Sequence, residues 1–112
     1  MSFADTPEPP YYAVIFTSRE SGSDSEAYAE TAGRMVDLAG RQPGFLGVES
    51  VRGEDGIGIT VSYWESLDAI QVWRKNEEHL AAQEKGRAEW YDRFELRVAK
   101  VERAHGFDRG DE

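Results

Sequence analysis

The stretch from residue 45 to residue 64 has the pattern of a β-hairpin, and this feature constrains the fold most strongly. Phe45 to Val51 is a run rich in β-forming residues. The sequence G-E-D-G at positions 53–56 consists of residues that tolerate positive φ, which is typical of a tight turn. Positions 57–64 then alternate between two sets of side chains, as a strand does.

The two sets define the two faces of that strand. One set is Ile57, Ile59, Val61 and Tyr63, and the other is Gly58, Thr60, Ser62 and Trp64. We expect the first set to face the helices, which predicts that Tyr63 lies in the interior and that Trp64 lies on the opposite face.

A strand and a helix are predicted before the hairpin. Tyr11 to Thr17 is dense in β-formers, and residues 18–22 are predicted to form a turn. Ser23 and Glu26 have the spacing of a capping box, which satisfies free amides where a helix begins. Gln42-Pro43-Gly44 is expected to stop this helix. Its apolar stripe consists of Tyr28, Ala32, Met35, Leu38 and Ala39.

Two helical segments and a strand are predicted after the hairpin. Ser66 can cap a short helix that carries Leu67, Ile70 and Trp73, and Asn76 can cap a second one from Glu77 to Lys85, closed by Gly86. The last element, from Trp90 to Arg103, is predicted to be a long strand. Its residues Phe94, Leu96 and Val98 share one face.

The predicted order is therefore β-α-β-β-α-β, an α+β ferredoxin-like arrangement with a four-stranded antiparallel sheet and helices on one face only. The other face then carries apolar residues without cover, for example Ala99 and Val101 of the last strand. An uncovered apolar face favours a symmetric partner. We therefore expect a homodimer.

Length and charge limit the remaining possibilities. The 112 residues allow one domain, which we place at residues 11–107, with a proline-rich tail at 1–10 expected to be disordered and a polar tail at 108–112. A net charge of −9 argues against nucleic acid and anionic membrane as partners. The absence of cysteine excludes a disulfide framework and thiolate chemistry. No signal peptide or membrane-spanning run is recognised, so we expect a cytoplasmic protein.

Several segments resemble the antibiotic biosynthesis monooxygenase family. They are I-T-V-S-Y-W-E-S-L-D-A-I-Q-V-W at 59–73, N-E-E-H at 76–79, Q-E-K-G at 83–86, P-G-F-L-G at 43–47 and W-Y at 90–91. The similarity extends over roughly residues 11 to 107. It implies a dimeric α/β barrel, each subunit holding a pocket for a small apolar or aromatic ligand.

The resemblance implies more than one activity. The oxygenase branch of the family oxidises polycyclic aromatic phenols with molecular oxygen and needs no metal, flavin or haem, so no cofactor is expected. A non-catalytic ligand-binding or stress-response protein of the same fold is the alternative. In the haem-degrading branch a histidine follows the pocket tryptophan by ten residues. Here that position is Gln83, and the first strand has no asparagine, which argues against haem degradation.

His79 is the candidate catalytic residue. It is the one histidine within the predicted core elements, and an imidazole can act as a general base near neutral pH. The alternative is a half-exposed histidine in the first turn of a helix. No second histidine or convergent carboxylate lies at a metal-binding spacing on that helix face, so no metal site is predicted.

The substrate-binding candidates are Tyr63, Ile70, Trp73 and Arg74. Trp73 could line a pocket for a flat aromatic ligand, or it could simply be core packing. The guanidinium of Arg74 could receive an anionic phenolate, or it could pair with surface glutamates. These residues lie on the short helix and the strand before it, which places the predicted pocket between these two elements.

Overall fold

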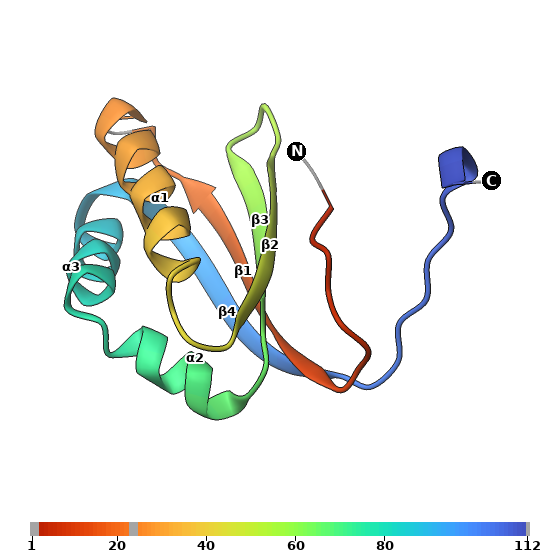
Figure 1. Cartoon of the computed structure of the whole chain (residues 1–112). Helices are drawn as coiled ribbons and strands as arrows, with labels where there is room; N and C mark the ends of the chain where they lie inside the picture. The colour runs from red at the N-terminus through yellow and green to blue at the C-terminus, as the bar shows by residue number, and fades with distance from the viewer. Residues whose placement is uncertain (1–2, 23–24, 112) are drawn as a thin grey trace.

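The computed structural model describes residues 3–22 and 25–111 and confirms the α+β, ferredoxin-like fold (Figure 1). The strands are β1 (Tyr11–Glu20), β2 (Phe45–Arg52), β3 (Ile57–Trp64) and β4 (Tyr91–Val101). The helices are α1 (Ser25–Ala39), α2 (Leu67–Arg74) and α3 (Glu77–Lys85), followed by a π-helical turn (Gly86–Trp90) and a short 3₁₀ turn (Arg109–Asp111). No helix among the described residues is both long enough and apolar enough to cross a membrane.

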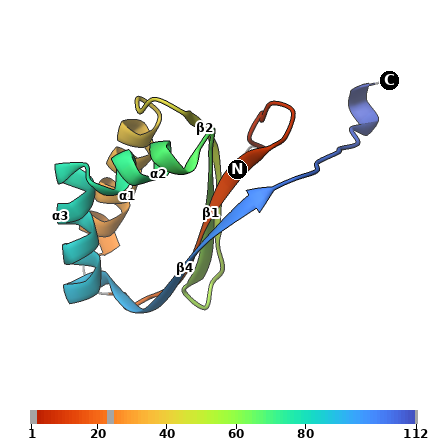
Figure 2. The same cartoon turned by 90° about the horizontal axis from the view of Figure 1, so that it is seen from below.

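The four strands form one antiparallel sheet in the order β2-β3-β1-β4. All three helices lie on one side of this sheet, and both terminal segments lie on the other side (Figure 2). In an antiparallel pair, residues directly opposite each other point to the same face. The register therefore assigns every strand residue to a covered face, toward the helices, or to an open face.

The assignment of the β3 faces from the sequence is wrong. Trp64 pairs with Tyr12, and both pack with residues of α1 and α2, so the covered face carries the set that includes Gly58, Ser62 and Trp64. Tyr63 lies on the open face with Ile57, Ile59 and Val61. The physical reason is that the Trp64 ring packs against residues of α1 and α2, whereas Gly58 leaves room for the guanidinium of Arg52.

The core lies between the covered face and the helices. Trp64 is fully buried, with 0% of its surface exposed, and it packs with Ala39 of α1 and with Ile70 and Trp73 of α2. The predicted stripe of α1 is confirmed at its C-terminal end, where Met35 and Leu38 pack against this cluster. This cluster joins β3 to both helices.

One boundary differs from the sequence prediction near the start of the chain. Ser18, Arg19 and Glu20 continue β1 instead of forming a turn, because they pair with β3, β4 or the hairpin turn, where the Glu20 amide donates to the Gly56 carbonyl (3.0 Å). The helix α1 begins at Ser25. The predicted capping residue Ser23 lies outside the described residues.

The caps of α2 and α3 are confirmed, whereas the role predicted for Gly86 is not. Ser66 accepts from the Ala69 amide, and Asn76 accepts from the amides of residues 78 and 79. Gly86 keeps right-handed helical geometry (φ −59°), and the chain continues into the π-helical turn. A Cβ at this position would lie 2.8 Å from the ring of Tyr91, so the glycine here makes room for that ring.

The open face is partly covered by residues 3–10. The Ala4 amide donates to Glu49 of β2 (3.1 Å), and the hydroxyls of Thr6 and Tyr11 are 3.1 Å apart. The part of this face near the β2–β3 hairpin turn stays uncovered. There Val51 pairs with Ile59, and both side chains are exposed. The open face therefore has one part covered by residues 3–10 and one apolar part that faces solvent.

Candidate functional site

Trp73 lies in a stack of three rings under the helices. Its indole is stacked on Trp64 of β3, with ring centroids 6.1 Å apart, and on His79 of α3, with centroids 4.2 Å apart and planes inclined by 14°. The capped starts of α2 and α3 place the two helices so that these rings meet. The structure thus brings together three of the predicted site residues: Trp73 stacks on His79 and lies in one core cluster with Ile70.

The hydrogen bonds of His79 determine its tautomer. Its Nδ1 lies 3.0 Å from the carbonyl oxygen of Trp73, and a carbonyl can only accept, so Nδ1 carries the proton. In the neutral ring Nε2 then keeps its lone pair. The nearest described partner of Nε2 is the side-chain amide of Gln83, at a long 3.4 Å. His79 therefore presents a weakly engaged acceptor nitrogen, which is what a general base needs.

Burial lowers the pKa of His79 below its ordinary value, and the nearby charge of Arg74 lowers it further, against the opposing effect of the hydrogen bond to Trp73. The unfolded chain consequently binds a proton at a higher pH than the folded chain does. The contribution of His79 to stability is complete above about pH 6.5 and is lost as the pH falls from there through the lowered pKa.

We therefore expect the wild type to lose more stability than a His79→Asn variant when the pH is lowered from 7.5 to 5.5. The difference should be a fraction of the upper limit of ~1.4 kcal/mol per pH unit for one proton, because the ring is only half-buried and solvent screens it. Urea unfolding at both pH values measures it. Equal losses in the two proteins would show that His79 does not titrate in this way.

The substrate-binding candidates differ in burial and in the face of the sheet on which they lie. Ile70 is buried in the core cluster, and Arg74 is exposed at the C-terminal end of α2. Tyr63 is on the open face, so it does not share a pocket with Trp73. Its hydroxyl donates to Glu49 (2.7 Å), and burial together with this carboxylate raises its pKa to about 12. Tyr63 therefore belongs to the contacts that hold residues 3–10, and the structure does not bring it together with Trp73.

An apolar strip on β4 extends the covered face beyond the ring stack. Leu96 and Val98 point to this face, since they pair with Phe16 and Val14 of β1. Both remain substantially exposed, at 44% and 45% of their surface. The helices therefore leave the β4 side of the covered face open to an apolar ligand.

A polar cluster that was not predicted surrounds Arg52, at the end of the sheet near the hairpin turn. The guanidinium donates to Ser18 (2.9 Å) and to the Tyr28 hydroxyl (3.0 Å), and it lies 3.7 Å from Glu20. The Tyr91 hydroxyl donates to Tyr28 (3.2 Å), and burial raises the pKa of Tyr91, as does this hydrogen bond. These residues are far apart in sequence, and no local motif joins them.

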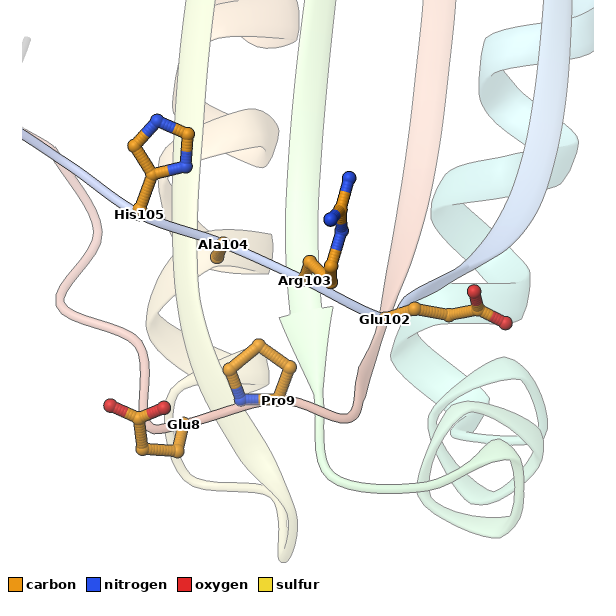
Figure 3. Close-up of a pocket in the computed structure, with 6 residues that line it drawn as sticks. All are labelled: Glu8, Pro9, Glu102, Arg103, Ala104 and His105. Atoms are coloured by element: carbon orange, nitrogen blue, oxygen red, sulfur yellow. The ribbon is translucent and has the colours of Figure 1, made fainter.

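Neither of the two hollows described below is lined by Trp64, Trp73 or His79. One, of about 580 Å³, lies between the terminal segments and is lined by Glu8, Pro9 and residues 102–105 (Figure 3). The other, of about 500 Å³, lies between α1 and α3. Within the described residues, no group of three or more histidine, aspartate or glutamate side chains is placed to hold a metal ion.

The chain thus combines a ferredoxin-like sheet, three helices on one face of it and a tryptophan–histidine stack between sheet and helices. A family model described as antibiotic biosynthesis monooxygenase matches residues 10–85. The chain belongs to this family.

Known relatives agree with this assignment. The chain is 65% identical over 102 residues to the uncharacterised protein YqjZ of Bacillus subtilis, covering 91% of this chain and 89% of that one. It is 30% identical over 94 residues to jasmonate monooxygenase ABM of Pyricularia oryzae, covering 80% of this chain but only 43% of the fungal protein. The structure of SnoaB, a cofactor-independent oxygenase from Streptomyces nogalater, superposes with a TM-score of 0.73 at 17% identity, covering 86% of this chain and 97% of SnoaB. At 17% sequence identity, the structural similarity to SnoaB shows a shared fold only.

Proposed function

We propose that this protein is a monooxygenase that oxidises a small aromatic, phenolic substrate with molecular oxygen. Family membership and two relatives named as oxygenases support the reaction class. The observation that carries the proposal is the state of His79, a neutral imidazole held by its Nδ1 proton with the Nε2 lone pair only weakly engaged.

In the proposed reaction the substrate supplies the electrons. Nε2 of His79 accepts the phenolic proton, and the exposed guanidinium of Arg74 stabilises the phenolate. The phenolate then reduces oxygen. With anthrone as the probe, one oxygen atom ends in the new quinone carbonyl. The other leaves as water with the two hydrogens that the substrate loses. The apolar strip of Leu96 and Val98 is the proposed floor for the aromatic rings.

We expect His79→Asn to lower the rate of oxygen consumption with anthrone by roughly 100-fold, the usual contribution of a general base. Asparagine can still donate to the Trp73 carbonyl from the position of Nδ1, but it lacks the Nε2 base. An oxygen electrode at fixed pH measures the rate against a protein-free control. His105→Asn is the matched control, because His105 lies in the C-terminal segment and should be dispensable.

A second candidate is a binding protein of the same fold that does not turn its ligand over. The close stacking of His79 on Trp73 favours it, since such a ring also serves packing alone. Oxygen uptake no faster than in buffer, together with saturable binding of phenols, would select this alternative over the oxygenase.

We also propose that the protein forms a homodimer through the open face. Ile59 is 42% exposed there beside the exposed Val51, and an uncovered patch of this kind favours burial against a second copy. The extended C-terminal segment supports this proposal, since its Phe107 is 77% exposed. Figure 1 shows this segment running away from the sheet.

Sedimentation velocity should accordingly show a dimer of the wild type at micromolar concentration. Ile59→Asp should shift it to monomer, because the variant would bury an unpaired charge in the interface. Val72→Asp is the control, since Val72 is an exposed apolar residue on the helical side. A monomeric wild type, or an Ile59→Asp protein that remains dimeric, would contradict the proposed interface.

A further inference from the structure

The groove between α1 and α3 has the character of a small-molecule site. Its volume of about 500 Å³ falls within the usual range for ligand pockets. Its apolar lining comes from both helices and from the π-helical turn, and it consists of Ala27, Met35, Ala81, Ala82 and Trp90. The small alanine side chains fill little of the space between the two helices, which leaves the groove open.

Trp90 contributes to this lining a buried polar group that has no partner among the described residues. Only 4% of its surface is exposed, and among the described residues its Nε1 has no hydrogen-bond partner. The indole of Trp64, by contrast, donates to Ser62 (2.9 Å). A buried donor without an acceptor is unfavourable, so a ligand that supplies the acceptor gains from it. The edge contact with Tyr28, at 5.6 Å between ring centroids, holds the Trp90 ring in place.

The charges at the rim indicate a neutral ligand. Arg34 of α1 pairs with Glu78 of α3 through two hydrogen bonds of 2.8 Å, and Lys85 pairs with Glu89 (3.1 Å). Both rim cations therefore already have carboxylate partners. The remaining rim charge is Glu30, which disfavours an anion.

The ion pair between Arg34 and Glu78 also links α1 to α3 across the groove. Both side chains are exposed, and an exposed pair of this kind contributes little to stability. Loss of this ion pair, should the helices separate to bring a ligand atom to the buried Nε1 of Trp90, therefore costs little.

We propose that the groove between α1 and α3 binds a small, neutral, flat apolar molecule with one hydrogen-bond acceptor, to which the indole N–H of Trp90 donates. The site is separate from the ring stack of Trp73 and His79. It goes beyond the proposed oxygenase activity and does not depend on it.

Two probes that differ only in the acceptor test the proposal on the full-length protein. 1-Indanone carries a carbonyl oxygen, and indane is the corresponding hydrocarbon. The three indole N–H resonances of the ¹⁵N-labelled protein report binding at each tryptophan, and a Trp90→Phe variant identifies the Trp90 signal. We expect 1-indanone to shift the Trp90 resonance to saturation and to bind roughly 3- to 10-fold more tightly than indane, the contribution of one net hydrogen bond.

Three variants sharpen the test. Trp90→Phe keeps a ring but removes the donor, so it should lower the affinity for 1-indanone to that for indane. Ala82→Phe fills the groove and should abolish binding of both probes. Leu80→Phe, on the exposed side of α3, should leave binding unchanged. Unshifted indole resonances of Trp64 and Trp73 in the free variants confirm that each one is folded.

Three results would contradict the proposed site. The first is a shift of the Trp73 or Trp64 resonance while the Trp90 resonance does not move. The others are equal affinity for the two probes and binding that Ala82→Phe does not affect. Oxygen consumption with anthrone is measured separately, so a failure here is distinguishable from a failure of the proposed function.

Discussion

Replacing Trp64 by alanine is expected to lower the free energy of unfolding by about 4 kcal/mol. Trp64 is fully buried, and its indole N–H donates to Ser62 (2.9 Å). Its ring packs edge-on against Phe45 and is stacked on Trp73, with centroids 5.3 and 6.1 Å away. Alanine removes all of these contacts and leaves a cavity where β2, β3 and α2 meet.

Urea unfolding followed by far-UV circular dichroism measures this loss. A domain of this size has a total stability of only about 5–15 kcal/mol, so the variant should be near the limit of folding. The control is Val72→Ala on the exposed side of α2, which should change stability by no more than about 0.5 kcal/mol. If Trp64→Ala cost less than about 1 kcal/mol, the core would not be organised around Trp64.

Gly44→Ala is expected to cost about 2–5 kcal/mol for two separable reasons. Gly44 has φ +84°, where a side chain is strained by roughly 1–2 kcal/mol. A Cβ there would also lie 2.7 Å from the Cβ of Ala69 in α2, and overpacking of this kind adds about 1–3 kcal/mol.

Gly56→Ala separates the two effects. Gly56 has nearly the same φ (+86°), but its nearest neighbour to an added Cβ is at an ordinary 3.5 Å. We expect this variant to show the backbone strain alone, about 1–2 kcal/mol. Adding Ala69→Gly to Gly44→Ala should recover part of the loss by relieving the clash. Equal effects of Gly44→Ala and Gly56→Ala would show that α2 does not pack closely on Gly44.

The order of the elements could be predicted because each has a local signal. The caps at Ser66 and Asn76 and the G-E-D-G turn work through neighbouring atoms, and the structure shows them as predicted. The continuation of β1 to Glu20 was not predicted, since strand length depends on pairing with distant partners.

Which face of β3 the helices cover could not be predicted from its alternation. Alternation distinguishes two faces but does not say which is buried, and the more apolar set with Ile57 and Ile59 was assigned to the core. The structure places Gly58 on the covered face, where an added Cβ would lie 2.7 Å from the guanidinium of Arg52. That constraint arises from packing between strands and cannot be read along one of them.

The candidate site was predictable only in part. Trp73 and His79 are six residues apart across a helix boundary, and their stacking depends on how α2 and α3 meet. Tyr63 was predicted on the covered face of β3, but it lies on the open face, away from Trp73. The Arg52 cluster and the unpartnered indole of Trp90 involve residues from elements distant in sequence, so three-dimensional contacts were needed to find them.

Isotope labelling tests the proposed monooxygenase reaction most directly. Anthrone is incubated with the purified protein under ¹⁸O₂ in ordinary water, and the anthraquinone formed is analysed by mass spectrometry against a protein-free control. The proposed reaction predicts protein-dependent quinone that is heavier by two mass units, with much less formed by His79→Asn. Quinone formed no faster than in buffer, or without the heavy atom from the gas, would contradict it.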